Sequence, residues 1–384
     1  MKILMIHNRY KITGGEDVST NAEAALLKNA GVDIETLIIT NDSIESENKI
    51  NLALNTIWSK KYHQLLLDKI EKNKYDIVHV QNFFPLFSPS VFYAAKKAGT
   101  KIIMTVRNYR LICPNGLMYV KGEICKACVG KAIPYPAIMK KCYRENLGAT
   151  SVIVGMLGIH NILNTWNTKV DGYICISQFV KDQLINGGFD SDKLFVKHNF
   201  VNSPVAPVFN AQDYYIFVGR TCDQKGIPLL LSAFEKNQKP LVIIGDGPLN
   251  ALVQLYVSRN SNIKFLGELS LEETYKKISN AKALISPSQS DEPFGRTIAE
   301  AFAHGTPVIG SALGGISELI QDGVNGFLFD PYKELDLQNA IYRLESISNS
   351  ESLRQGAYNS YQNRFTSDMN YNRVMDIYNY VLAS

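Results

Sequence analysis

Short apolar runs rich in β-branched residues alternate with helical stretches along this chain, and the alternation occurs twice over. Such runs, bounded by glycine or asparagine and separated by helices, predict parallel strands joined in βαβ units. We therefore expect an α/β fold with two Rossmann-like, doubly wound domains. The first set of predicted strands is Ile3–Ile6, Thr36–Ile39, Ile77–Val80, Ile102–Val106, Tyr173–Ser177 and Leu194–Val196; the second is Ile216–Val218, Leu241–Ile244, Ile263–Leu266, Leu284–Ser286 and Pro307–Ile309.

The chain has 384 residues, which is too long for one compact core. A linker is predicted at Asn202–Val208, because its prolines oppose both helix and central strand. We expect an N-terminal domain over residues 1–202 and a C-terminal domain over residues 203–366. The tail from Asp368 to Leu382 carries apolar residues at helical spacing and predicts a terminal amphipathic helix.

Composition and charge restrict the classes of partner. Residues 1–203 hold 25 Lys and Arg against 17 Asp and Glu, whereas residues 204–384 hold 15 against 19. A basic N-terminal half favours an anionic partner, such as a phosphorylated acceptor or a lipid surface, although plain solvated charge gives the same excess. No nucleic-acid-binding motif or long basic run is present, so we expect no nucleic acid partner.

The start of the chain and its longest apolar run bear on location. Met1–His7 predicts a first strand rather than a signal peptide, and the run at residues 151–158 is too short to span a bilayer. We therefore expect a cytoplasmic protein.

Two carboxylates, Glu292 and Glu300, flank a Phe294-Gly295 turn. A predicted strand precedes the first, and the second lies on a predicted helix over residues 297–304. Open α/β sheets bind ligands at the carboxyl ends of their strands, so both acids are expected along one ligand crevice. An ionised carboxylate accepts strongly from two adjacent hydroxyl groups, which is typical of sugar and ribose recognition.

A second strand end carries cations. The strand at residues 214–218 leads into Gly219-Arg220, and Lys225 follows. Arg220 offers a fork of donors to phosphate oxygens and Lys225 a point charge, so the pair can stabilise charge on a departing diphosphate. Taken alone, the same residues also fit a strand-end turn with surface cations.

Two glycine turns join a strand to a helix. Gly14-Gly15 follows the first strand, inside Thr13–Asp17, and opens a predicted helix over residues 18–29; Leu313–Glu318 is similar. Such turns bring backbone amides and a helix N-terminus to a phosphate. Neither turn has the three spaced glycines of the dinucleotide fingerprint, which counts against a nicotinamide enzyme.

The string from Pro287-Ser288 through Glu292, Phe294-Gly295 and Glu300 resembles the signature of retaining glycosyltransferases of family 4, whose two Glu residues are separated by seven positions. The Gly219-Arg220 and Lys225-Gly226 pairs are similar to the same family. The resemblance implies a GT-B type fold, in which two Rossmann-like domains face across a cleft and a last helix (367–384) returns to the N-terminal domain. It also implies transfer of a hexose, with UDP-glucose as the preferred donor, to a saccharide or lipid-linked saccharide acceptor in polysaccharide biosynthesis.

The resemblance assigns roles to individual residues. Glu300 would bind the ribose, Glu292 and the amides of Phe294 and Gly295 the hexose, and Leu266 would line the nucleobase. Catalysis would rest on Arg220, Lys225 and Glu292, and donor binding on Gly14, Gly15, Gly219, Leu266, Phe294, Gly295, Thr297 and Glu300.

One departure from the family lies after the strand at residues 102–106. Family members commonly place a His there, whereas this chain has Arg107-Asn108. Arg107 stays protonated and cannot act as a base, so we expect both residues to contact the acceptor or a phosphate.

Neither a metal nor another cofactor is expected. The Asp190-x-Asp192 triplet lies in a predicted polar turn, and no His-x-x-x-His pair is present. Cysteines leave one question open, because four of them in a loop-rich stretch fit either a structural zinc site or, as we favour, free thiols. These four are Cys113, Cys125, Cys128 and Cys142.

Two stretches, Leu52–Ile70 and Lys131–Lys141, mix cations with aromatic and apolar residues. Such a mixture suits a membrane headgroup region, but a core-facing helix with cations outside has the same composition. A peripheral position at the inner face of a membrane therefore stays open. Alternative functions are a nucleotide-sugar epimerase or glycan phosphorylase of the same fold, or a non-catalytic nucleotide-sugar-binding subunit.

Overall fold

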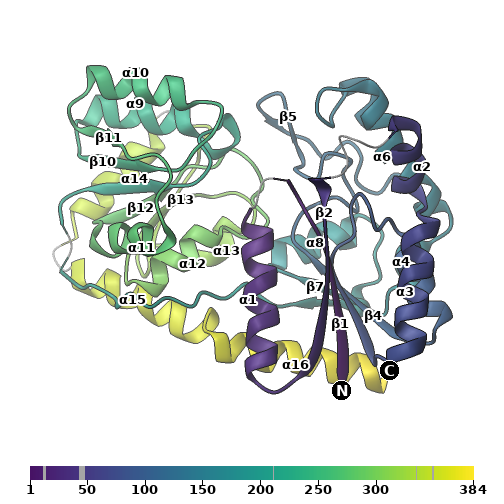
Figure 1. The fold of residues 1–384 in the computed structure, drawn as a ribbon. Helices are drawn as coiled ribbons and strands as arrows, with labels where there is room; N and C mark the ends of the chain where they lie inside the picture. The colour runs from purple at the N-terminus through teal and green to yellow at the C-terminus, as the bar shows by residue number, and fades with distance from the viewer. Residues whose placement is uncertain (12–13, 43–47, 211, 334, 348–349) are drawn as a thin grey trace. The chain divides into compact units, whose positions relative to one another are not determined.

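The computed structural model describes residues 1–11, 14–42, 48–210, 212–333, 335–347 and 350–384. The chain divides into two compact units, which Figure 1 draws with their elements labelled. The first unit comprises residues 1–118, 125–197 and 370–384, and the second comprises residues 119–124 and 198–369. The division after residue 197 lies five positions before the predicted boundary at 202, and residues 119–124 cluster with the second unit.

The first unit is built on a parallel sheet with the order β2-β1-β3-β4-β7-β8. Strand β3 is buried at every position, as expected where helices cover both faces of a sheet. The strands are β1 (Lys2–Arg9), β2 (Asp33–Thr40), β3 (Ile77–Asn82), β4 (Lys101–Val106), β7 (Gly172–Cys175) and β8 (Leu194–Val196), and the helices are α1 (Gly15–Asn29), α2 (Lys49–Ile57), α3 (Lys60–Asn73), α4 (Ser90–Lys97), α5 (Pro136–Lys140), α6 (Leu147–Ile162), α7 (Thr165–Lys169) and α8 (Gln178–Asn186).

The last helix, α16 (Ser367–Ala383), contributes to the core of the first unit. Its buried face includes Val374 and Ile377, which cluster with Ile3 of β1 and Ile103 of β4. The predicted return of the terminal helix to the N-terminal domain is thereby confirmed.

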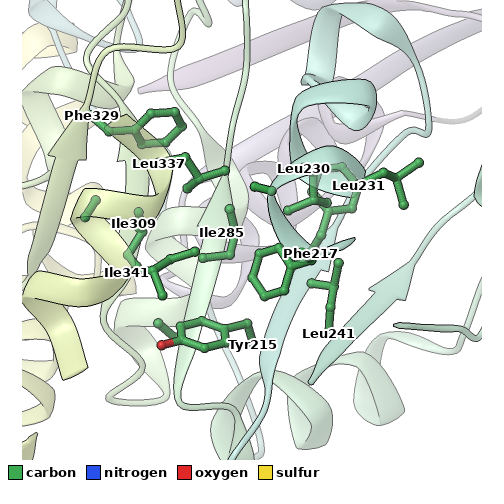
Figure 2. Close-up of a cluster of buried hydrophobic side chains, with 14 of the residues drawn as sticks. Tyr215, Phe217, Leu230, Leu231, Leu241, Ile285, Ile309, Phe329, Leu337 and Ile341 are labelled. Atoms are coloured by element: carbon green, nitrogen blue, oxygen red, sulfur yellow. The ribbon is translucent and has the colours of Figure 1, made fainter. Parts of the chain in front are cut away.

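The second unit has a parallel sheet with the order β11-β10-β9-β12-β13-β14. Its core gathers apolar side chains of the sheet, such as Phe217 and Ile285, with Leu230 of α9 and Ile341 of α14 (Figure 2). The strands are β9 (Tyr215–Val218), β10 (Leu241–Ile244), β11 (Ile263–Phe265), β12 (Ala283–Ser286), β13 (Val308–Ser311) and β14 (Gly326–Phe329), the helices are α9 (Ile227–Asn237), α10 (Asn250–Arg259), α11 (Leu271–Asn280), α12 (Arg296–Ala303), α13 (Ile316–Leu319), α14 (Asp336–Glu345) and α15 (Ser350–Arg364), and a short hairpin pairs β5 (Tyr119–Val120) with β6 (Glu123–Ile124).

The predicted α/β class and doubly wound sheets are confirmed, with three local differences. Strand β14 was not predicted, because Gly326–Phe329 is short and has no β-branched residue. The hairpin β5–β6 was also not predicted. The stretch Leu52–Ile70 falls in two helices, because Trp58 is extended and Ser59 caps α3 by accepting a hydrogen bond from the Tyr62 amide.

Each sheet reverses its strand order at one place. In the first unit the reversal falls between β1 and β3, and in the second it falls between β9 and β12. Ligands of open α/β sheets bind outside the carboxyl ends of the strands at such a switch point. The glycine turn after β1 lies at the first switch point, and the loops after β9 and β12, which carry Lys225 and Glu292, lie at the second. Among the described helices, none combines the length and the apolar character that crossing a membrane would require.

Candidate functional site

The loops that follow β9 and β12 meet at the switch point of the second unit. The Lys225 Nζ lies 2.7 Å from Oε1 of Glu292, and the Ser288 hydroxyl donates to the same oxygen at 2.7 Å. The Glu292 side chain is 12% exposed and that of Lys225 is 35% exposed, so both side chains stay partly accessible to a ligand from solvent. Sequence reasoning placed both residues in the site, and the structure brings them into direct contact.

Gly226 explains why the two loops can approach each other. Its φ is +73°, in the left-handed region, and a Cβ atom there would overlap the carbonyl oxygen of Pro287. The Gln289 amide donates to the Gln224 carbonyl at 3.0 Å beside this contact. Only glycine satisfies both the backbone angle and the close approach, so Gly226 fixes the distance between Lys225 and Glu292.

A third loop, which follows β13, packs on the backbone of Glu292. The Gly315 amide donates to the Glu292 carbonyl at 2.7 Å. At Gly314 the φ is +53°, and a Cβ would lie 2.6 Å from the Glu292 nitrogen and oxygen. The Leu313–Glu318 turn, expected from sequence to line the ligand crevice, thus also supports the loop that carries the first carboxylate.

The second carboxylate lies deeper. The Glu300 side chain is 7% exposed, and Nε of Arg296, one helical turn earlier on α12, lies 2.8 Å from its Oε1. The Tyr275 hydroxyl is 3.5 Å from the same oxygen. Burial raises the pKa of Glu300, and the Arg296 guanidinium opposes this rise. A ribose bound by Glu300, as predicted, would have to share or replace the Arg296 contact.

The remaining predicted donor residues of the second unit follow β9 or β11 or lie at the start of α12. Arg220 is exposed, and no described residue forms an ion pair with it. Leu266 is 39% exposed, as a nucleobase wall requires, while Thr297 is half-buried on the first turn of α12. Gly219 leads out of β9, and Gly295 precedes α12 with a φ of +87°.

His198 is a site residue that sequence reasoning missed. Its ring stacks on that of Phe294 with centroids 5.8 Å apart, and its Nε2 lies 2.8 Å from Oε1 of Glu318. His198 belongs to no motif, since it follows the last strand of the first sheet. The available sequence signal is its partner Glu318, an acid at the end of the predicted Leu313–Glu318 turn, which needs a polar or cationic partner.

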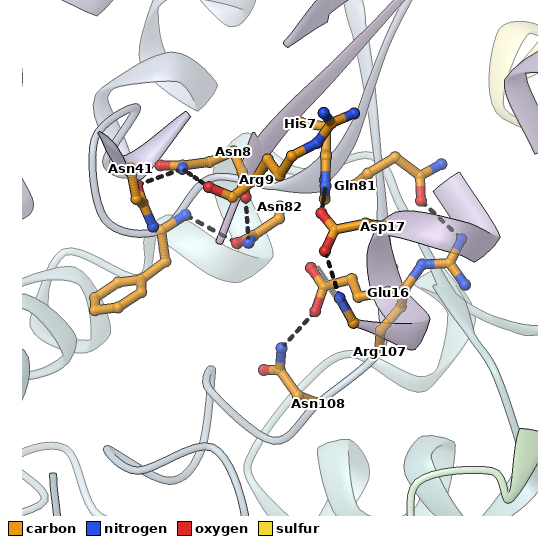
Figure 3. A network of polar contacts seen from close by, with 12 residues as sticks. His7, Asn8, Arg9, Glu16, Asp17, Asn41, Gln81, Asn82, Arg107 and Asn108 are labelled. Carbon is orange, nitrogen blue, oxygen red and sulfur yellow. Dashed lines mark hydrogen bonds and ion pairs between the residues drawn. The ribbon is translucent and has the colours of Figure 1, made fainter. Parts of the chain in front are cut away.

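In the first unit, the end of β1 and the start of α1 share a buried polar contact (Figure 3). Nε2 of His7 lies 2.7 Å from Oδ1 of Asp17, and the Gly14 amide donates to the other oxygen of Asp17 at 2.9 Å. Burial lowers the pKa of His7, and Asp17 opposes the shift. The Gly14-Gly15 turn is therefore held by an acid from its own helix; its neighbour Thr13 lies outside the described residues.

Glu16 stands next to this contact and faces Asn108. The Asn108 amide donates to Oε2 of Glu16 at 3.3 Å (Figure 3). Burial raises the pKa of Glu16 to about 7, with Arg107 opposing and Asp17 adding to the rise. Sequence reasoning took Glu16 and Asp17 only as part of a glycine turn, although two acids behind Gly-Gly at a strand end are a detectable signal.

Arg107, predicted on the acceptor side, is bound to other side chains of the protein. Its Nη2 donates to Glu23 at 3.1 Å and to Gln81 at 2.9 Å, and its side chain is 5% exposed. Lys197 lies 3.3 Å from the other oxygen of Glu23. Burial alone would raise the pKa of Glu23, but Lys197, His79 and Arg107 outweigh it and lower the pKa to about 2. A contact of Arg107 with an acceptor stays a prediction, and it would compete with this network.

The cysteines form no evident metal centre. Within the described parts of the chain, no group of three or more His, Cys, Asp or Glu side chains is arranged to bind a metal ion. All six cysteines are free thiols. Cys128 packs with Cys142, Ala137 and Val154, and burial raises the pKa of the Cys128 thiol to about 12.

Comparison with known proteins shows the family. Residues 202–363 match the family model described as glycosyl transferases group 1. An uncharacterised glycosyltransferase of Methanocaldococcus jannaschii is 34% identical over 303 residues, which cover 76% of this chain and 81% of that protein. This chain belongs to the group 1 glycosyltransferases. The predicted glycosyltransferase activity is thereby confirmed at this level, while the assignment to family 4 and the retention of configuration stay predictions.

Further relatives of this glycosyltransferase carry more specific names. The O-antigen chain mannosyltransferase C of Escherichia coli is 31% identical over 179 residues, which cover 45% of this chain and 48% of that protein. The crystal structure of Anabaena HepE in complex with UDP-glucose aligns with a TM-score of 0.66 at 17% identity, covering 98% of this chain and 99% of that one. The structural likeness shows that the glycosyltransferase has the GT-B type of fold.

Proposed function

We propose that this glycosyltransferase moves a hexose from a nucleotide-diphosphate sugar to a saccharide or lipid-linked saccharide, with retention at the anomeric carbon. The observation that carries the proposal is the Lys225–Glu292 pair at 2.7 Å on the switch point, with exposed Arg220 on the same strand end. A carboxylate for sugar hydroxyls and two cations for a diphosphate are what such a reaction needs from one crevice.

The chemistry follows from these charges. The bond between the anomeric carbon and the diphosphate oxygen breaks, the diphosphate leaves with the bonding electrons, and the acceptor oxygen forms the new bond on the same face. The acceptor proton passes to the leaving phosphate. Arg220 and Lys225 stabilise the charge that grows on that phosphate, so the proposal includes no metal ion and no other cofactor.

The two acids position the donor rather than break its bond. In the proposal Glu292 accepts from hexose hydroxyls and Glu300 from the ribose, while the amides of Phe294 and Gly295 approach the sugar. Lys225 and Arg296, at 2.7 and 2.8 Å, hold these carboxylates in place before the donor binds. Preorganised charges of this kind lower the cost of reorganisation when the donor arrives.

For the donor we propose UDP-glucose. The structural likeness to Anabaena HepE, solved with UDP-glucose, supports a uridine donor, whereas the E. coli mannosyltransferase name favours a mannosyl donor. For the acceptor we propose a growing polysaccharide repeat on a lipid carrier. The excess of Lys and Arg in residues 1–203 supports an anionic acceptor or lipid surface. We further propose that the enzyme is cytoplasmic and acts at the inner face of a membrane.

The first experiment is a thermal-shift screen of UDP-, GDP- and ADP-sugars, because a ligand that binds only the folded state raises the Tm. UDP-glucose is expected to give the largest rise, and Glu292→Gln is expected to abolish most of it. An equal rise in Glu292→Gln would contradict the role of that carboxylate.

The second experiment separates the enzyme classes. Incubation of the donor with lipid-linked saccharide should release the nucleoside diphosphate and give a product whose anomeric configuration, read by NMR, matches the donor. A new nucleotide sugar without any acceptor would indicate an epimerase, sugar 1-phosphate from glycan and phosphate a phosphorylase, and donor binding without turnover a binding subunit.

A further inference from the structure

Helix α6 turns apolar side chains toward solvent as well as toward the core. No Asp, Glu, Lys or Arg occurs between Leu147 and Ile162. Ile153 and Leu157 are buried, yet on the exposed side Ile159 is 43% and Ile162 66% exposed. A surface helix of a globular protein normally carries charged and polar residues on its outer face, so exposed isoleucines on a helix without charged residues indicate a partner for that face.

The neighbouring helix α2 extends this surface. Nε2 of His160 on α6 lies 3.1 Å from the carbonyl oxygen of Ile57 on α2, and the two helices lie side by side in Figure 1. On α2, Ile50 is 70% and Leu54 61% exposed. The apolar surface is therefore not confined to a single helix.

The segment that enters α5 flanks α6 as well. The Asn161 amide donates to the carbonyl of Ala132 at 3.0 Å. In this segment Ile133 is 51%, Tyr135 55% and Met139 79% exposed. We call the exposed apolar side chains of α2, of residues 133–139 and of α6 the apolar face.

Cations outnumber acids along residues 131–163 and on helix α2. Lys131, Lys140, Lys141 and Arg144 are all exposed, and Glu145 is the single acid in residues 131–163. Helix α2 adds Lys49 and no acid. Apolar and aromatic side chains together with Lys and Arg match the boundary between acyl chains and anionic headgroups.

We propose that the apolar face docks this enzyme on an anionic lipid bilayer. The inference deepens the proposed function and rests on it for the lipid-linked acceptor that such docking would bring within reach. Charge decides between a bilayer and a second copy of the chain. In a twofold dimer the same patch meets itself, so the cations of one copy would face those of the other, whereas anionic headgroups complement them.

The test uses the full-length protein and vesicles of phosphatidylcholine alone or mixed with phosphatidylglycerol. The wild type is expected to cosediment with the mixed vesicles, more weakly as salt rises, and only slightly with phosphatidylcholine. The double variant Met139→Glu, Ile162→Glu is expected to lose at least about tenfold in partitioning, since both charges would enter apolar lipid. The matched control is Tyr342→Glu, an equally exposed site (73%) on α14 of the second unit, which should bind like the wild type.

Two results would overturn the proposal. One is a wild type that ignores phosphatidylglycerol vesicles, or a double variant that binds them as well as the wild type while its Tm is unchanged. The other is a concentration-dependent dimer that the double variant abolishes, which would make the face an interface between copies. Vesicle binding needs neither donor nor acceptor, so docking with silent transfer would count against the proposed function alone, and transfer without docking against this inference alone.

Discussion

Two glutamates on helix α1 of this glycosyltransferase show how the surroundings of a carboxyl group set its pKa. Glu16 sits at the start of α1 beside Asp17 and has a pKa near 7, while Glu23 on the same helix, next to Lys197 and Arg107, has a pKa near 2. The two acids differ because cations surround only Glu23 closely enough to outweigh burial. Each pKa implies a measurable dependence of stability on pH.

For Glu16 the sign is unusual for an acid. Its folded pKa of about 7 exceeds the ordinary 4.5, so the folded state holds the proton more tightly between those values and stability falls as pH rises through this window. In the wild type the free energy of unfolding should fall between pH 5 and pH 7.5. Glu16→Gln should make this fall smaller by roughly 1–3 kcal/mol. Urea unfolding at several pH values measures it, and an unchanged pH slope in the variant would refute the shifted pKa.

Arg354 has a structural role, because its buried guanidinium binds backbone carbonyl groups. It is 2% exposed, and its guanidinium donates to the carbonyls of Val208, Ala281 and Ser279 at 2.7–2.8 Å. Arg354→Met leaves these acceptors buried without donors and should cost roughly 3 kcal/mol. Arg343→Met, which removes a half-exposed ion pair with Asp322, should cost less than about 1 kcal/mol, so equal urea midpoints for the two variants would contradict this reading.

At the scale of elements, the site of the second unit depends on loops that interlock rather than on any one helix or strand. Gly226 places the loop after β9 against Pro287, and Gly315 holds the backbone of Glu292. The ion pair between Lys225 and Glu292 is a product of this packing. A change in a loop glycine should therefore affect donor binding without touching a charged group.

Gly226→Ala tests this dependence against a matched control. At Gly31 the φ is +80° and a Cβ would meet nothing within 4 Å, so Gly31→Ala should cost only the backbone strain of roughly 1–2 kcal/mol. Gly226→Ala adds the overlap with Pro287 and should cost about 1–3 kcal/mol more. Its donor affinity, measured by calorimetry, should also fall at least about tenfold, while that of Gly31→Ala should not change.

At the scale of the whole molecule, the chain is two units whose cores can be probed separately. Its only two tryptophans, Trp58 and Trp166, both belong to the first unit, so their fluorescence reports the unfolding of that unit. The terminal helix α16 follows the second unit in sequence but buries Ile377 in the core of the first. A substitution in α16 should therefore change the unfolding transition that the tryptophans of the first unit report.

Ile377→Ala should destabilise the first unit by roughly 2–4 kcal/mol, because it leaves a cavity at a side chain that is 1% exposed. The midpoint of the tryptophan transition should fall accordingly, while Asn379→Ala on the exposed side of α16 should leave it unchanged. Arg354→Met is the converse control, since it lies in the other unit and should move the far-UV transition only. A tryptophan transition that ignores Ile377→Ala would place α16 outside the first core.

Much of the fold was predictable because its information is local. Strands such as Leu241–Ile244 and the helix at residues 297–304 follow from periodicity and from glycine and proline at their ends. The hairpin β5–β6 and strand β14 escaped prediction because they are two to four residues long and carry little pattern.

The amino-acid sequence by itself determined the alternation of strands and helices, the positions of Glu292, Arg220 and Lys225 after strands and of Glu300 on a helix, and thereby the family. Only the tertiary structure decided which of these side chains meet. The order of the strands places β9 beside β12, and long-range packing gave Arg107 to Glu23, 84 residues away, and His198 to Glu318, 120 residues away. The reason is physical: propensity and periodicity act over a few residues, whereas a polar side chain removed from water takes whatever partner the folded chain brings within hydrogen-bond distance.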